Sequence, residues 1–160
     1  MKKLLLVLLV VSFTSVSFSK DLAWKKFNVG IADAKKSGKK VLIDVYTDWC
    51  KWCKTMDTVT YKDKNIKTYL EKNFVLIKLN AEGNEQITYS GQKMSPGEFA
   101  QGMRVDGYPA TLFMKTTGEP ITVLPGFSEP KMFIHVLTFI SENHFEKKSF
   151  EQYLKEKGVK

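Results

Sequence analysis

Apolar and polar positions follow a helix-and-strand pattern along the first half of the chain. Two short apolar runs, 41–46 and 74–80, have the pattern of strands buried on both faces of a sheet. Apolar residues at helical spacing precede the first run, over 21–36, and separate the two runs, over 54–61 and 65–72. This order of helix, strand, helix and strand favours two parallel strands joined by a helical crossover.

The second half of the chain predicts a hairpin and more helices. Apolar runs at 111–114 and 121–124 flank the turn sequence 117–120, which indicates an antiparallel hairpin. The stretch 81–94 is polar and contains glycine, so we expect a loop insertion there. Three helices are expected, each with a start signal or an apolar face: 96–104, 129–143 and 149–157. The pattern predicts one α/β domain over 20–160.

The first 19 residues form a separate segment with the features of a secretory signal peptide. Lys2 and Lys3 precede the apolar run Leu4 to Val11, and Ser17 and Ser19 are spaced like a small-x-small cleavage site. A transmembrane anchor is the alternative, but serines and threonines interrupt the run well short of the roughly 20 residues that a spanning helix needs. We therefore expect cleavage near Ser19, a periplasmic or otherwise extracytoplasmic location, and no stable membrane insertion.

Composition and charge narrow the classes of partner. Hydrophobic residues make up 43% and charged residues 26% of 160 residues, which excludes a disordered or collagen-like chain. Removal of residues 1–19 takes two lysines and no acid and lowers the formal charge from +8 to +6. The lysines come in pairs scattered along the chain, so they indicate a solvated surface. Export also argues against a nucleic-acid partner.

The two cysteines, Cys50 and Cys53, stand directly after a predicted strand and at the start of a predicted helix. The unpaired N–H groups at the start of a helix stabilise a thiolate, so the pKa of Cys50 is expected to fall from about 8.5 into the range of roughly 3.5 to 7.5. Cys53, one turn later, is expected to be more buried and able to attack a mixed disulfide at Cys50. The spacing therefore suits a dithiol that opens and closes.

Three other uses of a Cys-x-x-C pair fit less well. A c-type haem site needs histidine after the second cysteine, where Lys54 stands. A metal site needs two more ligands, and His135 on a predicted core-facing helix is more often a packed or surface residue. A structural disulfide that closes so short a loop adds little stability. We expect no metal.

Two charged residues interrupt the apolar strands. Asp44 lies in the middle of the first strand and Lys78 in the second. Because burial of a lone charge costs several kcal/mol, the two side chains are expected to meet across neighbouring strands. A structural ion pair at a strand end is one interpretation. The other is a carboxylate whose proton affinity is raised by burial and which takes the proton from Cys53.

Pro109 stands just before the predicted hairpin, in the sequence Gly107-Tyr108-Pro109-Ala110-Thr111. Proline that enters a sheet lies at an edge or at the start of a strand. A cis Tyr108–Pro109 bond is one way to make that turn, although a trans bond is the default for an X-Pro sequence.

Together these residues resemble the thioredoxin superfamily over nearly the whole chain after the signal segment. The resemblance rests on Asp44, the hexapeptide 49–54, residues 78–80 and residues 108–111. The stretch 46–61 is most similar to exported bacterial thioredoxin-like proteins, including the reductase domain at the C-terminal end of the periplasmic membrane thiol transporter. The Lys51-Trp52 dipeptide departs from the Gly-Pro of cytoplasmic thioredoxin and affects the redox potential.

The resemblance implies a thioredoxin fold, with a central mixed sheet of four to five strands, flanking helices and here an extra C-terminal helix. It implies Cys50 as nucleophile, Cys53 as resolving thiol and Asp44 as acid/base group, with Lys78 as a structural or proton-relay residue. It also implies that Trp49 packs beneath the active-site turn. Trp52 is expected either in an exposed docking face or packed locally. The substrate-binding residues are expected to be Trp49, Lys51, Trp52, Tyr108 and Pro109.

The leading functional hypothesis is an exported thiol:disulfide oxidoreductase that acts chiefly as a reductant and needs no cofactor. Its partners would be client proteins with disulfides and an unidentified thiol donor, for which a membrane thiol transporter is one candidate; the protein would be a monomer. A disulfide oxidase or isomerase is the first alternative. A non-catalytic, thiol-dependent binding module is the second.

Overall fold

A mixed four-stranded sheet forms the centre of the computed structural model, which describes residues 21–159. Its strands stand in the order β2-β1-β5-β6. β1 pairs in parallel with β2, and the other neighbours are antiparallel. The bounds are Lys40–Tyr46 for β1, Phe74–Asn80 for β2, Ala110–Met114 for β5 and Pro120–Pro125 for β6. The mixed sheet, the crossover and the hairpin expected from the sequence are confirmed.

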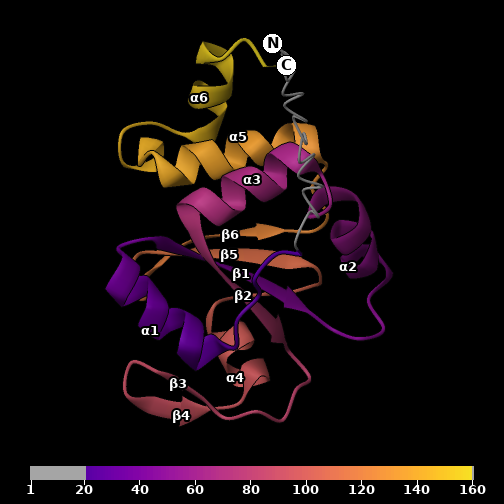
Figure 1. Ribbon diagram of the computed structural model, residues 1–160, viewed down its shortest axis with the longest axis vertical. Helices are drawn as coiled ribbons and strands as arrows, with labels where there is room; N and C mark the ends of the chain where they lie inside the picture. Colours follow the sequence, from indigo (N-terminus) through magenta and orange to yellow (C-terminus); the bar gives the residue numbers. More distant parts are fainter. Residues whose placement is uncertain (1–20, 160) are drawn as a thin grey trace, which may run out of the picture.

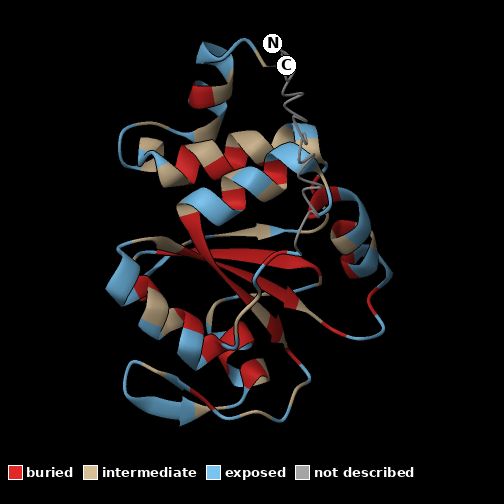
Figure 2. Cartoon of the chain, viewed as in Figure 1, coloured by how far each residue is buried: buried red, intermediate tan, exposed pale blue. Residues whose placement is uncertain are grey.

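Helices cover both faces of the sheet (Figure 1). On one face α3 (Lys64–Asn73) and α5 (Pro130–Ser141) pack over Leu42 and Phe113, and on the other α1 (Phe27–Ser37) and α4 (Pro96–Gly102) pack over Ile43 and other residues of the sheet. Successive strand residues point to opposite faces, so the continuous apolar run of β1 supplies both halves of the core. The strands β1, β2 and β5 are accordingly almost entirely buried, whereas the edge strand β6 is not (Figure 2).

The first helix begins at Phe27 rather than at Asp21, which corrects the predicted start. Residues before Phe27 run along the open edge of β2, where the N–H of Lys25 donates to the carbonyl of Leu76 at 2.9 Å. The carbonyl of Lys25 accepts from the N–H of Lys78 at 3.2 Å. The apolar residues in this segment therefore pack from an extended backbone, which helical spacing alone could not reveal.

The helix after the cysteines begins earlier than predicted and changes type. It consists of α2 (Lys51–Thr55) and the π-helical turn η1 (Met56–Thr60), which closes with a hydrogen bond of 2.9 Å from the N–H of Tyr61 to the carbonyl of Met56. The hydroxyl of Thr58 donates to the carbonyl of Lys54 at 2.9 Å and competes for a backbone acceptor of this turn. Such π-turns are frequent at functional sites.

The stretch 81–94 contains a small hairpin instead of an unstructured loop. Its strands are β3 (Ile87–Tyr89) and β4 (Gln92–Met94), joined through Ser90 and Gly91, which both have positive φ. Ile87 is buried, and the side chain of Asn28 in α1 accepts a hydrogen bond of 2.8 Å from the N–H of Thr88. The prediction of a loop missed these strands because each has three residues within a polar stretch.

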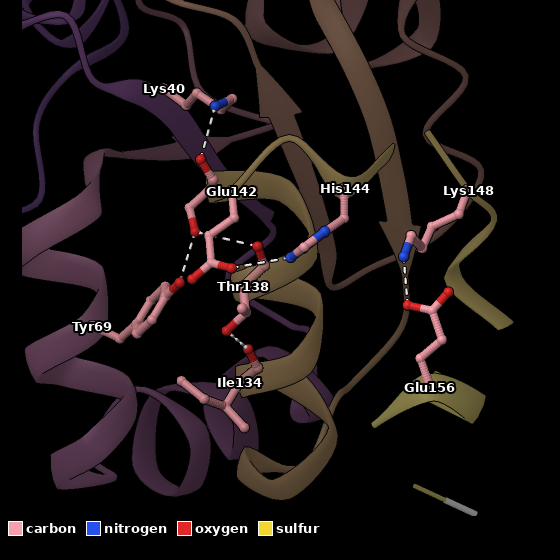
Figure 3. Close-up of polar contacts among 9 residues, drawn as sticks. Lys40, Tyr69, Ile134, Thr138, Glu142, His144, Lys148 and Glu156 are labelled. Atoms are coloured by element: carbon pink, nitrogen blue, oxygen red, sulfur yellow. Dashed lines mark hydrogen bonds and ion pairs between the residues drawn. The ribbon is translucent and has the colours of Figure 1, made fainter. Parts of the chain in front are cut away.

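The expected C-terminal helix is α6 (Phe150–Glu156), which follows the short turn η2 (His144–Glu146). Capping boxes begin both α6 and α4, as the sequence predicts. Polar contacts surround the end of α5 (Figure 3): Lys40 donates to the carbonyl of Ser141, and the hydroxyl of Ser141 lies 2.7 Å from that of Tyr69. Lysine at the carboxyl end of a helix also suits the helix dipole. Within residues 21–159, no helix has both the length and the apolar character needed to cross a bilayer.

Candidate active site

Cys50 and Cys53 form a disulfide at the turn from β1 into α2. The N–H of Cys50 donates to the carbonyl of Thr47 at 3.2 Å, and Cys50 is the N-cap of α2. Its sulfur accepts a hydrogen bond of 3.0 Å from the N–H of Cys53. That N–H would stabilise a thiolate at Cys50 after reduction. The cysteines are 3% and 4% exposed, so the expectation that Cys53 is the more buried of the two is wrong for the disulfide form.

Asp44 and Lys78 meet across β1 and β2, as the sequence predicts. They are register partners, and Nζ of Lys78 lies 3.0 Å from Oδ2 of Asp44. Asp44 is 2% exposed. Burial raises the pKa of Asp44, and the positive charge of Lys78 offsets only part of that effect. Burial lowers the pKa of Lys78, but the charges of its carboxylate partners outweigh burial and raise that pKa overall.

Asp57 is a further member of this group that the sequence interpretation missed. Its carboxylate forms a short contact with Nζ of Lys78, which thus bridges two carboxylates. The ammonium also lies 5.0 Å from the ring centre of Trp24 and 5.6 Å from that of Tyr61. The position of Asp57, four residues after Cys53, was the available signal, because that spacing keeps a helical residue near the same face.

The two oxygens of Asp44 have different surroundings. Oδ2 contacts Lys78, whereas Oδ1 is buried without a hydrogen-bond partner in the described part of the chain. The hydroxyls of Tyr61 and Thr111 are also buried and lack a regular hydrogen bond there, and Thr111 is the register partner of Asp44 on β5. Burial raises the pKa of Tyr61 well above its usual value, so this phenol stays protonated. An unpaired carboxylate oxygen is costly as an anion and is available to take a proton.

A cavity of about 500 Å³ lies beside this group, on the side of Lys78 and Asp57. Trp24, Tyr61 and Lys62 also line this cavity. Asp44 does not line the cavity, so Lys78 and Asp57 stand between the buried carboxylate and this space.

Trp49 lies on the surface, which corrects the expectation that it packs beneath the active-site turn. Its side chain is 65% exposed, and its indole N–H donates to the carboxylate of Glu82 at 2.9 and 3.0 Å. The ring also meets that of Tyr108 edge to face, with centroids 6.1 Å apart. Glu82 follows the end of β2 closely, so tertiary structure brings a polar partner to Trp49 that turns the indole outward.

Trp52 is 60% exposed and also packs locally, so the expected local packing is confirmed, and a role in docking stays a prediction. Its ring lies 5.5 Å from that of Phe127 in the loop between β6 and α5. Lys51 is the first residue of α2 and is exposed. The Tyr108–Pro109 bond is cis, and the carbonyl of Pro109 accepts a hydrogen bond of 2.8 Å from the N–H of Gly126. Tyr108 and Phe127 thus bring two distant segments to the residues around the disulfide.

The mixed sheet with helices on both faces, and the Cys-x-x-C pair where β1 turns into α2, define a thioredoxin-like domain. A family model for the thioredoxin-like domain matches residues 27–141, and the chain belongs to that family. Residues 21–159 contain no group of three or more histidine, cysteine, aspartate or glutamate side chains that could hold a metal ion.

The curated relatives of the chain include thiol:disulfide interchange proteins called DsbD. The Vibrio cholerae protein is 27% identical over 125 residues, which cover 77% of this chain and 19% of the relative. The Vibrio vulnificus protein is 30% identical over 130 residues, with 80% and 20% covered. The chain thus spans about one fifth of the length of these relatives.

Solved structures with the same fold include a thioredoxin-fold protein from Helicobacter pylori. That structure has a TM-score of 0.65 at 20% identity, with 82% of this chain and 98% of the other covered. The oxidised DsbD C-terminal domain from Neisseria meningitidis has a TM-score of 0.51 at 21% identity, with 71% and 96% covered. Both similarities show that the chain shares the fold of these proteins.

Proposed function

We propose that the protein is a periplasmic thiol:disulfide oxidoreductase that reduces disulfides of client proteins. The observation that carries the proposal is the Cys50–Cys53 disulfide at the start of α2, directly after the strand that holds the buried Asp44. The names of the relatives, thiol:disulfide interchange proteins, support the same class of reaction.

The proposed reaction is a pair of thiol–disulfide exchanges. The thiolate of reduced Cys50 attacks one sulfur of a client disulfide, the client S–S bond breaks, and the other client sulfur leaves as a thiolate that takes a proton from water. Cys53 then loses its proton and attacks the sulfur of Cys50. The mixed disulfide breaks, the second client sulfur leaves, and the Cys50–Cys53 bond forms. The client gains two electrons and the protein loses two.

Asp44 is the proposed acceptor of the Cys53 proton. Its raised pKa brings its proton affinity closer to that of a thiol than an exposed carboxylate would have. Lys78 and Asp57 stand between Asp44 and the adjacent cavity, so we propose that the proton later leaves by this side. Lys78 is therefore assigned a relay and structural role, and the proposed reaction needs no cofactor.

The proposed direction is reduction of the client, because the family analogy associates the paired Asp44 and Lys78 with reductants. Equilibration of the purified protein with reduced and oxidised glutathione tests this direction. A reduction potential below roughly −200 mV is expected, whereas a potential well above that value would overturn the assignment as a reductant. Reactivation of a scrambled substrate by the monomer would favour an isomerase.

Electrons for the next cycle are proposed to come from a dithiol on another protein, for which a membrane thiol transporter is the candidate. The DsbD relatives motivate this choice. They are thiol:disulfide interchange proteins, and the chain matches only about one fifth of their length, so we propose that the donor dithiol is carried by a separate protein. The further proposal is that the protein works in the periplasm as a monomer after cleavage near Ser19, and that it has no nucleic-acid partner. Residues 1–19 lie outside the described residues.

A client trap tests the exchange chemistry. Cys53→Ser leaves Cys50 as the attacking thiol and removes the group that resolves the mixed disulfide, so covalent adducts with client proteins should accumulate. Mass spectrometry of exported proteins identifies these adducts. The control Cys50→Ser should trap none by this route. Unchanged partner binding without any adduct in Cys53→Ser would instead support a non-catalytic binding module.

A further inference from the structure

The exposed Trp52 and the half-buried Phe127 form an aromatic pair next to the disulfide. Trp52 lies between the two cysteines in the sequence, and its ring is tilted by 31° to that of Phe127. The loop that carries Phe127 is held by the hydrogen bond from Gly126 to the carbonyl of Pro109. The pair is thus built from α2 and from a loop anchored beside β5, which gives its large apolar surface a defined position.

Trp52 remains largely exposed in spite of this contact. Large hydrophobic side chains are exposed at four positions within residues 21–159, and two of these, Trp49 and Trp52, flank Cys50. A tryptophan side chain that already packs against another ring on one face has lost much of its freedom to rotate. Binding of a partner to its exposed face therefore costs little further side-chain entropy. The feature therefore points to recognition of a side chain next to the reacting sulfur.

The surroundings of Trp52 are basic. Lys51 and Lys54 are exposed on α2, and their ammonium groups have no hydrogen-bond or ion-pair partner within the described chain. Nearby carboxylates are engaged elsewhere, since Asp57 contacts Lys78 and Asp48 accepts a hydrogen bond from Asn80. Glu129, two residues after Phe127 in the sequence, is an exposed carboxylate of the loop that leads into α5. Two uncompensated cations on the same short helix as Trp52 favour a partner that carries carboxylates.

We propose that Trp52, Phe127, Lys51 and Lys54 select client segments in which a large apolar side chain and carboxylates lie next to the reacting cysteine. This inference rests on the proposed function and adds a substrate preference to it. Trp52 and Phe127 contact the apolar side chain, and the two lysines attract the carboxylates. The occupant is a segment of a client protein rather than a second copy of this chain.

Four peptides of equal length test the preference. Each contains one cysteine in a mixed disulfide with the same small neutral thiol. The residue next to this cysteine is phenylalanine or serine, and each of these two forms is made with either two glutamates or two lysines nearby. Release of the small thiol by reduced protein gives a rate constant for each peptide. Reduction of the symmetric disulfide of that thiol corrects for changes in the reactivity of Cys50.

The wild-type protein is expected to favour phenylalanine over serine by about fivefold, and glutamate over lysine by about threefold at low salt. Trp52→Ala should lose the preference for phenylalanine and keep the preference for glutamate, while Trp52→Phe should keep the preference for glutamate and part of the preference for phenylalanine. The double variant Lys51→Glu/Lys54→Glu should prefer the lysine peptides. The matched control Lys35→Glu/Lys36→Glu changes the net charge equally on α1 and should leave both preferences unchanged.

The outcomes separate this proposal from the proposed function. Equal rates for all four peptides, with the symmetric disulfide still reduced, would overturn the substrate preference alone. Failure to reduce any disulfide would overturn the proposed function. A dimer of the wild-type protein that Trp52→Ala dissociates would show that a second copy covers this surface, and that result would also overturn the preference.

Discussion

Asp44 illustrates how a single buried residue acquires chemistry from its surroundings. One carboxylate oxygen meets Lys78, and the other is buried without a partner in the described chain. An exposed aspartate would have water at both oxygens and an ordinary pKa. Here burial favours the protonated form, whereas Lys78 keeps the charged form accessible. The balance between these effects is what suits the residue to exchange a proton with a thiol.

Asp44→Asn should change how stability depends on pH. Because the folded-state pKa of Asp44 is raised, the unfolded chain releases this proton first as the pH rises above 3.8, and the wild-type protein loses stability up to the folded-state pKa. The variant has no such loss, so its stability relative to wild type should increase across that window. Urea unfolding from pH 3 to pH 8 measures the difference.

Asp33→Asn is the control, because the stability that Asp33 contributes is expected to change with pH in the opposite direction. The hydrogen bond from Lys25 lowers the pKa of the exposed Asp33, so its contribution is present above 3.8 and is lost as the pH falls through its folded-state pKa. A difference between Asp44→Asn and wild type that does not vary with pH would contradict the titration assigned to Asp44.

Asp57→Asn should shift the pH dependence of client release towards lower pH. The charge of Asp57 contributes to the raised pKa of Asp44, so its removal lowers that pKa and ionises the proton acceptor at lower pH. Rapid-mixing kinetics of the mixed-disulfide resolution step measure the profile. Glu119→Gln removes a remote carboxylate that pairs with Lys115 and should leave the profile unchanged. An unmoved profile in Asp57→Asn would separate Asp57 from the proton acceptor.

At the scale of elements, the packing of α1 on β2 depends on a glycine. A Cβ built at Gly30 would lie 2.3 Å from Cγ1 and 2.5 Å from Cδ1 of Ile77. Ile77 is itself fully buried and precedes Lys78 on the strand. The close approach of helix and strand therefore leaves no room for a side chain.

Gly30→Ala should destabilise the protein by about 1–3 kcal/mol, because overpacking outweighs the gain in helix propensity. Gly102→Ala is the control, since Gly102 is the last residue of the helix α4 and a Cβ there meets nothing within 4 Å. The control should change stability by less than about 1 kcal/mol. Chemical denaturation compares the two, and equal effects would show that Ile77 relaxes to accommodate the methyl group.

Elements with long, strongly patterned apolar runs were predictable, and short or irregular ones were not. β1 and β2 agree with their predicted ranges, and the capping boxes place the starts of α4 and α6. The hairpin β3–β4 and the π-helical turn η1 escaped prediction because their stability depends on contacts with distant residues. Asn28, 60 residues before Thr88, accepts a hydrogen bond from the hairpin, and the ring of Phe99 in α4 packs against that of Tyr89.

At the scale of the whole molecule, the N-terminal segment is predicted to direct the domain out of the cytoplasm. The composition of residues 1–19 predicts export and removal of this segment. Expression of the 160-residue chain in a bacterium with a periplasm should yield a soluble periplasmic protein that begins at Lys20, as measured by intact mass. Leu8→Arg interrupts the apolar run and should keep the precursor inside the cell. Recovery of the uncleaved chain from the membrane would support the alternative of an anchor.

The sequence by itself determined the class of fold and the redox pair, because strand burial, helix spacing and the Cys-x-x-C motif are local properties of the chain. It also indicated that Asp44 and Lys78 meet, since two charges in neighbouring apolar strands compensate each other. Tertiary structure decided the rest of the site. Asp57 contacts Lys78, Glu82 holds Trp49 at the surface, and Phe127 supports Trp52. These partners come from separate elements, and only the folded backbone fixes which side chains face one another.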